Sequence, residues 1–558
     1  MLGGGLQLAL IPAPLIAAAI IVFALAPRHA RLARIIAGIG GVASITLLAI
    51  EAGFLGSGGR IETSLGTPVT GIDYLLRLDL PGAVLGLAAA VVGVLLLFDA
   101  DRQTREVSAL LVCVTGALLS ALAGNLVMLT GGVEIAGVGT LLMTSAARGR
   151  VGRGGLMAIG LAHLASIGLL VAAVQLLSSS GTTDFAVIPA GAVGAAIAGP
   201  WAAAGVARLL ATAFVPVRGN RTPTAAWAAT GAIPCGAIVL LRLREVVDGP
   251  LPQQIAIMLA AVGGLAAVWA AVLALRWSSV PAVAGRALCV IAAAPVVALS
   301  GVASAAADAA VAAGICALML IASLTPAWER VARGRTGRGL AVLALGIAGS
   351  LPMGFGMTAL ILELAATVSM GRAGAALLAA LGLGTLLGAA AGVRAASRIA
   401  LSPRTGDAGE RLSPLAAVAA LASLAGAIVP GAAAATVLAA LRPGGLAVPV
   451  GAAAIRSAAG DWSGGYLLVA LVVIAAGVWA LVTLWGKTLP TRPSVAFETE
   501  PVGVQALGLR PARRLRPILL RAGTGLSQLD EWLIVQPQLA LALGGAIVAI
   551  IAADVFVH

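Results

Sequence analysis

Long apolar segments recur from one end of this 558-residue chain to the other, and they constrain its fold more than any other feature. Each is close to the length at which an α-helix crosses the hydrocarbon core of a bilayer, about 20 residues. Charged residues make up 10% of the chain, far below the roughly 25% of soluble domains. The sequence predicts an all-α polytopic membrane protein with about sixteen transmembrane helices, at 6–26, 33–54, 81–98, 107–123, 125–143, 155–177, 187–210, 223–241, 253–275, 287–303, 306–325, 339–365, 373–392, 413–430, 463–486 and 536–557.

The positive charge of the chain fits a membrane surface better than a nucleic acid. The net charge is +13, and it comes almost entirely from arginine because Lys487 is the only lysine. With the N-terminus outside and the helices alternating in direction, 27 of the 35 basic residues fall in inside loops and 7 in outside segments. This asymmetry follows the positive-inside rule. It predicts a multi-pass protein of a bacterial-type inner (plasma) membrane with both termini outside.

The chain divides into segments by composition. The first apolar segment lacks a basic region before it and is interpreted as a retained helix. Residues 55–80 form an outside loop whose alternating pattern suits a hairpin. Residues 511–535 mix arginine with leucine, isoleucine and tryptophan, and suit either an amphipathic surface helix or a basic tether; 431–462 fits a short re-entrant or surface helix. The predicted divisions are 1–106, 107–241, 253–400, 413–486, 487–535 and 536–558.

No cofactor is expected in this chain. The four cysteines lie singly in apolar stretches, without any C-x-x-C pair, and are interpreted as small packing residues. The sequence also lacks a nucleotide-binding loop and a haem motif.

Charged residues inside predicted helices are the candidate functional groups, because charge at mid-bilayer costs roughly 2.5–3.5 kcal/mol. Glu134 lies at the middle of helix 125–143 and is the strongest candidate for a proton-relay group; the alternative is a structural hydrogen bond. His163 suits a packing histidine, which we favour, or a member of the same path. Arg208 either pairs with Glu134 or extends toward the inside water. The other candidates lie near helix ends, where water or the helix dipole accommodates them: Glu51, Arg242, Asp308 and Glu363.

Two predicted helices contain interruptions. One lies around Pro216 and Pro223, and the other around Pro352 and Gly354. Broken helices in a membrane are tolerated where they line a cavity or are buried in protein. Corresponding interruptions in two halves are typical of inverted-repeat transporters, although a plain proline kink or short loop also fits.

Four motifs in order resemble one family, the antiporter-like membrane subunits shared by respiratory complex I, Mrp sodium/proton antiporters and membrane-bound hydrogenases. The resemblance spans roughly residues 70–400. It rests on the motifs LRLDL (76–80, with Asp79), NLVML through Glu134 (125–134), TPTAA followed by GAIVLLR (222–242) and GSLPMGF (349–355). The family implies two inverted repeats, 107–241 and 253–400, each with a broken helix, and places Glu134 on the functional glutamate.

The lysines of this family are missing from the corresponding positions. Ala211 occupies the place of the lysine before the first break, with Arg208 one turn earlier, and no lysine lies near Thr358. Ala229 occupies the place of a histidine. Arginine does not replace a titrating lysine freely, because it stays protonated.

The resemblance implies a membrane-arm subunit of a complex I-like, redox-driven proton or sodium translocating complex, of the quinone-reducing dehydrogenase or hydrogenase type. Its expected partners are other antiporter-like and small membrane subunits, lipids, and peripheral redox subunits that carry iron–sulfur, nickel–iron or flavin cofactors. Pumping would be either reduced to a path through Glu134, Arg208 and water, or lost, which we slightly favour. The alternatives are a stand-alone secondary transporter and a lipid-linked-sugar glycosyltransferase that uses Asp73 and Asp79.

Overall fold

The computed structural model describes the N-terminal half of the chain, namely residues 8–25, 29–55, 59–67, 73–97, 104–146, 153–189, 191–211, 224–247 and 251–276. The chain divides into two compact units. The first comprises Met1–Pro216, Thr230–Val239 and Thr499–His558, and the second comprises Val217–Ala229 and Leu240–Glu498. Several predicted features lie outside the described residues: the helices from 287 onward, Pro216, Pro223, Pro352, Gly354, Asp308 and Glu363.

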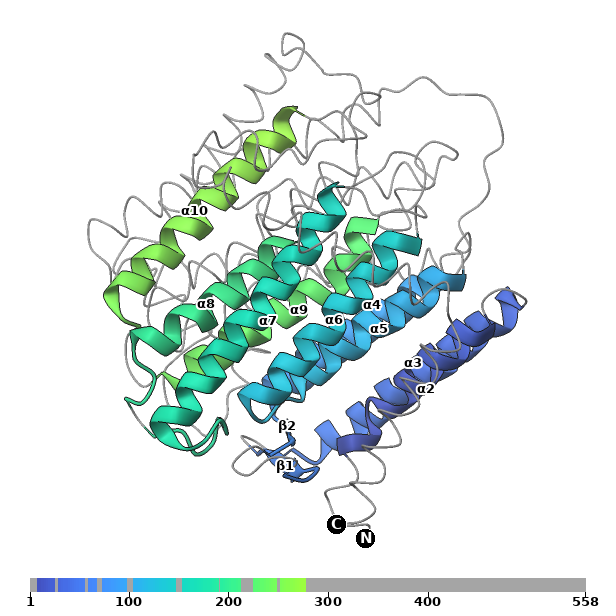
Figure 1. Ribbon diagram of the computed structural model, residues 1–558. Coiled ribbons are helices and arrows are strands. Elements are labelled where there is room, and N and C mark those ends of the chain that lie inside the picture. The colour runs from blue at the N-terminus through green and yellow to red at the C-terminus, as the bar shows by residue number, and fades with distance from the viewer. Residues whose placement is uncertain are drawn as a thin grey trace, which may run out of the picture. The chain divides into compact units, whose positions relative to one another are not determined.

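The described residues form helices and one small sheet. The helices are α2 (Ala13–Leu25), α3 (Ala30–Gly53), α4 (Leu80–Leu97), α5 (Thr104–Ala121), α6 (Leu126–Ala146), α7 (Arg153–Ser180), α8 (Ala195–Leu210), α9 (Thr224–Val246) and α10 (Gln253–Arg276), and the strands are β1 (Ile61–Ser64) and β2 (Leu75–Leu78). In Figure 1, α2 to α8 run along one common direction, with β1 and β2 at one end of this bundle. Each described helix matches one predicted segment.

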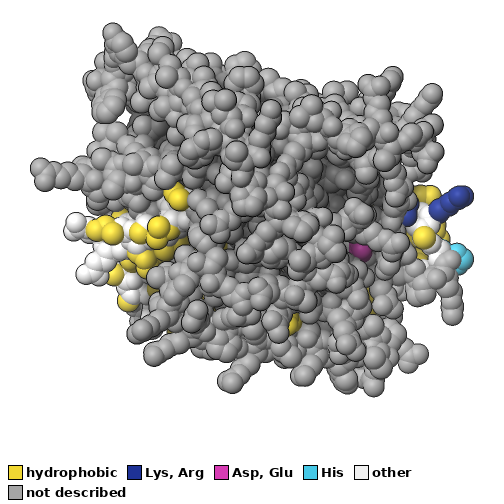
Figure 2. All heavy atoms as spheres, turned by 90° about the horizontal axis from the view of Figure 1, so that it is seen from above, with side chains coloured by type: hydrophobic (Ala, Val, Ile, Leu, Met, Phe, Trp, Pro, Cys, Tyr) yellow, Lys and Arg dark blue, Asp and Glu magenta, His cyan; other side chains and the backbone are white. Residues whose placement is uncertain are grey.

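Five of the described helices are long and apolar enough to cross a membrane: Leu8–Leu25, Ala30–Gly53, Leu80–Leu97, Leu126–Met143 and Ala158–Ser180. The outward side of α3 is apolar along its length, with Ile35, Ile39 and Val42 all exposed. Exposed apolar stripes of this kind suit lipid or another membrane subunit. Figure 2 shows yellow apolar side chains at one edge of the view and blue basic side chains beside a histidine at another.

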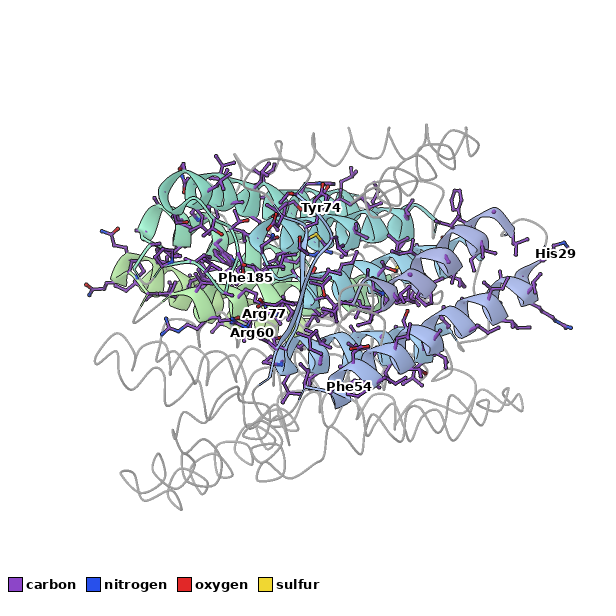
Figure 3. The ribbon with its side chains drawn as sticks, turned by 90° about the horizontal axis from the view of Figure 1, so that it is seen from below. His29, Phe54, Arg60, Tyr74, Arg77 and Phe185 are labelled. Carbon is purple, nitrogen blue, oxygen red and sulfur yellow. The ribbon has the colours of Figure 1, made fainter. Side chains whose placement is uncertain are left out.

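The basic side chains in that view agree with the sequence at the start of α3. His29 and Arg31 are exposed there, Arg34 is half-buried, and Figure 3 places His29 and Phe54 at opposite ends of this helix. Arginine side chains at the end of a spanning helix can reach the membrane surface while their stems remain in the apolar region. These two arginines therefore suit a helix end at the bilayer interface.

The α5–α6 contact depends on small residues. A Cβ on Gly116 would lie 2.2 Å from the backbone nitrogen of Ala136, and one on Gly132 would lie 2.5 Å from the nitrogen of Ser120. Only glycine permits such an approach between helix backbones. This contact fixes the side of α6 that carries Gly132 and Ala136 against α5, and leaves other sides of α6 for α7 and beyond.

The hairpin predicted within 55–80 is present. β1 pairs antiparallel with β2, with Ile61 opposite Leu78 and Ser64 opposite Leu75. The sheet is also joined to the α5–α6 junction, because Arg77 donates from its backbone to the Leu122 carbonyl at 2.7 Å and Gly124 donates to the Leu75 carbonyl at 2.9 Å. Through β2, these hydrogen bonds join the hairpin and the start of α4 to the chain that leads into α6.

Two polar side chains begin the helices beside this hairpin. The Asp79 carboxylate accepts a hydrogen bond from the Gly82 backbone at 3.0 Å, and the Asn125 side chain accepts one from Met128 at 2.9 Å. These are N-cap contacts, which satisfy backbone donors that have no partner within the helix. Asn125 also donates from its amide to the Asp73 carbonyl.

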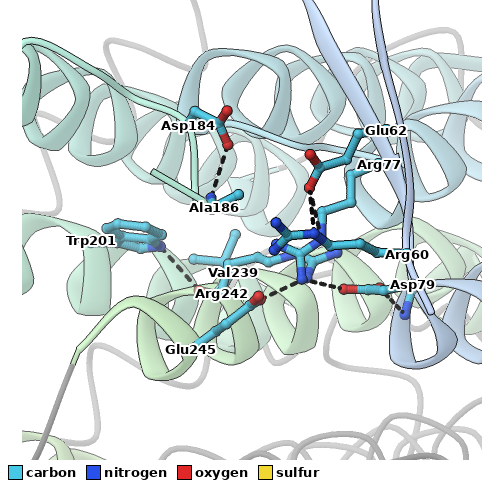
Figure 4. A network of polar contacts seen from close by, with 11 residues as sticks. Arg60, Glu62, Arg77, Asp79, Asp184, Ala186, Trp201, Val239, Arg242 and Glu245 are labelled. Atoms are coloured by element: carbon cyan, nitrogen blue, oxygen red, sulfur yellow. Dashed lines mark hydrogen bonds and ion pairs between the residues drawn. The ribbon is translucent and has the colours of Figure 1, made fainter. Parts of the chain in front are cut away.

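Helix α8 begins at Ala195, eight residues later than the predicted segment 187–210. The intervening chain is a loop, because the Asp184 carboxylate accepts a hydrogen bond from Ala186 at 2.9 Å and Gly191 has a φ of +77°. Both features favour turns over helix. Further along, Trp201 of α8 donates from its indole to the Val239 carbonyl of α9 at 3.0 Å, as Figure 4 shows.

Candidate functional site

Glu134 lies near the middle of α6, as the sequence predicts for a group at mid-depth. It is not on the glycine-lined side that packs against α5. Its side chain is 38% exposed, but its carboxylate oxygen Oε2 is completely buried. Gly131 and Val138, about one turn away on either side, are exposed. Glu134 therefore lies at the border between the interior of the bundle and an outer face of α6.

His163 of α7 is the direct partner of Glu134. Its ring nitrogen Nδ1 lies 2.6 Å from the carboxylate oxygen Oε1, and its side chain is 18% exposed. Ser166, about one turn further along α7, also lies beside the carboxylate. An imidazole can bind and release a proton near neutral pH, and a carboxylate can accept one. The pair is therefore a candidate proton-binding site.

Each member of this pair keeps one polar atom without a hydrogen-bond partner among the described residues. These atoms are Oε2 of Glu134 and Nε2 of His163, and both are buried. Buried polar atoms are nearly always satisfied, by protein or by ordered water. The two atoms therefore mark the directions in which water or a further polar group would continue the chain of hydrogen bonds.

Arg208 lies in the last turn of α8, and its side chain is completely buried. It does not extend to water at the end of its helix. It also forms no ion pair within 4.0 Å of a carboxylate of the described residues, although its charge acts on Glu134 from a greater distance. The sequence left two alternatives for Arg208, a pair with Glu134 or extension toward the inside water, and the structure instead pairs Glu134 with His163 and buries Arg208.

Two cysteines border Arg208, which the sequence did not predict. Cys113 of α5 and Cys235 of α9 are buried and close enough to Arg208 to interact with its charge. Gly137 of α6 lies beside the guanidinium, because a Cβ built there would be 3.9 Å from Nη1. Cysteines that lie singly in apolar helices carry no sequence signal of a shared location.

A second polar cluster lies at the hairpin. Arg77 Nη2 is 3.2 Å from the Asp79 carboxylate, and Glu62 lies 3.3 Å from Arg60 and 3.9 Å from Arg77 (Figure 4). Figure 3 shows Arg60 and Arg77 close together beside the hairpin. The Asp79 carboxylate, considered for sugar transfer, is thus occupied by Arg77 and by the cap of α4.

The remaining candidates near helix ends have ordinary structural surroundings. Glu51 is half-buried near the end of α3. In the second unit, Arg242 donates to Glu245 at 2.7 Å along the same turn of α9. Within the described residues, no group of three or more histidine, cysteine or acidic side chains has the arrangement of a metal site.

Comparison with solved structures identifies the fold. One chain of the Mrp complex from Dietzia sp. DQ12-45-1b superposes with a TM-score of 0.68 at 16% sequence identity, covering 96% of this chain. A chain of the membrane-bound sulfane sulfur reductase, an archaeal respiratory membrane complex, superposes with a TM-score of 0.60 at 16% identity. This chain has the fold of these membrane subunits.

The coverage of the two solved chains differs. The alignment with the Mrp complex covers 63% of that chain. The alignment with the sulfane sulfur reductase covers 99% of that chain and 98% of this one. No protein-family model and no curated protein sequence matches the chain. The resemblance predicted from the ordered motifs is therefore confirmed by the fold, where sequence comparison finds nothing.

Proposed function

We propose that this chain is a membrane-arm subunit of a complex I-like assembly that moves protons or sodium ions across a bacterial-type inner membrane. The observation that supports this most is the Glu134–His163 pair in the middle of two spanning helices, within a fold shared with the Mrp and sulfane sulfur reductase subunits. Energy would come from redox reactions in peripheral partners of the dehydrogenase or hydrogenase type, which would hold the iron–sulfur, nickel–iron or flavin groups.

The proposed proton site consists of Glu134 and His163, with Arg208 as a fixed charge. A proton that reaches the pair is held between the carboxylate and the imidazole, whose Nδ1 and Oε1 atoms are 2.6 Å apart. His163 Nε2 and Glu134 Oε2 then offer two buried positions for water molecules on either side. Arg208 supplies a fixed positive charge and is not a relay, because arginine does not release its proton in proteins.

A neighbouring membrane subunit would cover the outer face of α6 beside Glu134. An ionisable pair that faces lipid is strongly unfavourable, and such residues normally face protein or water. Glu134 is 38% exposed on a face where Gly131 is also open, and a Cβ on Gly131 would meet nothing within 4 Å. We therefore place a partner helix against this face.

Coupled ion translocation by the intact complex tests the relay. With Glu134→Gln, proton movement in vesicles per redox turnover should fall at least about tenfold, because general acid–base groups typically contribute 10²–10⁴-fold to proton transfer. Glu51→Gln is the matched control, since Glu51 lies near a helix end. If translocation by Glu134→Gln equals that of the control, the chain acts as a scaffold that has lost pumping.

Co-purification tests the assembly. Affinity isolation of the tagged chain in mild detergent, followed by mass spectrometry, should recover other antiporter-like subunits and at least one redox protein. A chain that is recovered alone and moves ions in liposomes would be a stand-alone secondary transporter. A protease-accessible tag at either terminus, cleaved only from the outside, would support the proposed topology.

A further inference from the structure

We propose that Arg208 binds a small monovalent inorganic anion of the halide class in the core of the first unit, beside Cys113, Gly137 and Cys235. The site is distinct from the Glu134–His163 pair, but it rests on the proposed proton binding of that pair, because the protonated pair leaves the charge of Arg208 uncompensated. It is argued from the guanidinium alone and from the groups that surround it.

The guanidinium of Arg208 is buried, and its neighbours among the described residues include the thiols of Cys113 and Cys235 but no carboxylate within 4.0 Å. Its side chain has 0% exposure, and its three nitrogens Nε, Nη1 and Nη2 all lack a hydrogen-bond partner among the described residues. An arginine carries five N–H donors and cannot lose its charge in a protein. A buried cation of this kind is strongly unfavourable unless a negative group accompanies it.

The thiols beside Arg208 do not supply that negative charge. Cys113 Sγ is directed to the Ala136 carbonyl at 3.9 Å. Ser120 donates its hydroxyl hydrogen to the Gly116 carbonyl at 2.8 Å, so the Cys235 thiol 3.3 Å away donates to Ser120. Both thiols are thus protonated donors, and sulfur is a weak acceptor. The two sulfur atoms therefore place lone pairs near the guanidinium, but they do not add a negative charge.

Glu134 compensates Arg208 in only one protonation state. When the Glu134–His163 pair holds an extra proton, whether as carboxylate and imidazolium or as carboxylic acid and imidazole, that pair is neutral. The three residues then carry a net charge of +1 in the interior. Water satisfies N–H donors but adds no charge, so an anion is the ligand that restores neutrality.

The surroundings select a small ligand. Gly137 leaves room for about one methyl group beside Nη1, because a Cβ there would lie at ordinary contact distances from Ala162, at 3.5 Å, and from Nη1, at 3.9 Å. A polyatomic dianion such as sulfate would change the net charge from +1 to −1 and is larger than a methyl group. A halide needs few donors and is polarisable, which suits neighbours that are thiols and methyl groups.

Thermal unfolding of the purified complex tests the site. The unfolding temperature is measured in sodium chloride, in sodium bromide and in sodium gluconate at equal ionic strength. Binding to the folded state should raise it by roughly 2 °C or more in both halides relative to gluconate. Arg208→Met should abolish this difference, and Arg31→Met, which removes an exposed arginine at the start of α3, should keep it.

A second variant keeps the arginine and fills the space. Gly137→Ala places a methyl group at ordinary contact distances, so the complex should assemble normally while the halide effect is reduced or lost. An equal effect in wild type, Arg208→Met and Gly137→Ala would assign the halide effect to another place and overturn the proposal. No halide effect in the wild type would mean that water alone surrounds Arg208, and would also overturn it.

Discussion

The hairpin cluster and the α6–α7 pair use the same residue types in opposite ways. At the hairpin, the charges of Arg77 and Asp79 are paired at 3.2 Å, and Asp79 also caps α4. In the bundle, Glu134 pairs with His163, its side chain is partly exposed, and its oxygen Oε2 lacks a hydrogen-bond partner among the described residues. Paired and capped charges specify a structure, whereas buried charges with unfilled hydrogen-bonding positions are what a proton or ion site requires. The difference fits a structural role for the first region and the proposed proton site for the second.

Asp79→Ala should cause the largest loss of stability. It removes the cap of α4 and the closest carboxylate of the buried Arg77, and breaking a buried ion pair costs about 3–5 kcal/mol. We expect a lower unfolding temperature of the complex but normal ion translocation per folded complex. A variant with normal stability would contradict the structural role of the cluster.

His163→Gln should reduce ion translocation and leave stability nearly unchanged, the opposite of Asp79→Ala. Glutamine can still donate a hydrogen bond to Glu134, but it cannot accept the proton, so coupled translocation should fall about tenfold or more. The unfolding temperature should change little. Vesicle acidification and thermal unfolding, measured on the same preparation, separate the two effects; a parallel loss of both would place His163 with the structural residues.

Asn125→Ala should have an intermediate effect on stability, about 1–2 kcal/mol, because it removes the N-cap of α6 and the bond to the Asp73 carbonyl. The change lies nine residues before Glu134 on the same helix. Denaturant unfolding measures the loss. Asn125→Asp keeps the capping oxygen and should recover most of it.

Arg60→Ala should have the smallest effect, below about 0.5 kcal/mol. Its side chain is 52% exposed and its contact with Glu62 is a surface ion pair, which typically contributes little and weakens with salt. Unfolding at low and high salt checks this. A large effect at Arg60 would mean that the hairpin cluster depends on its exposed member.

The sequence predicted the described helices well because a bilayer imposes length and apolarity directly. The hairpin followed from the alternation and turn residues within 55–80, and the later start of α8 was missed because Asp184 and Gly191 act through local turns. Glu134 was found because a carboxylate in an apolar helix is conspicuous. The pairing of Glu134 with His163 was not predicted, because 29 positions separate the two residues and only the packing of α6 on α7 brings them together.

Arg208 shows a further limit of the sequence. The chain retains a cation near the position where the family has a lysine, which suggested a pair with Glu134. The structure surrounds it instead with two thiols and a glycine from three other helices. Such an environment depends on the rotation of each helix, which apolar periodicity does not specify in a helix that is apolar on every side.

The close α5–α6 contact also restricts which movements could accompany the proposed ion translocation. Gly116, Gly132 and Gly139 each bring backbone against backbone, over two turns of α6. Neither helix can slide or rotate past the other without steric overlap. Glu134 therefore lies on a helix that is fixed against α5, and under the proposed function the access of protons from each side would come from rearrangement of α7, of water, or of a neighbouring chain.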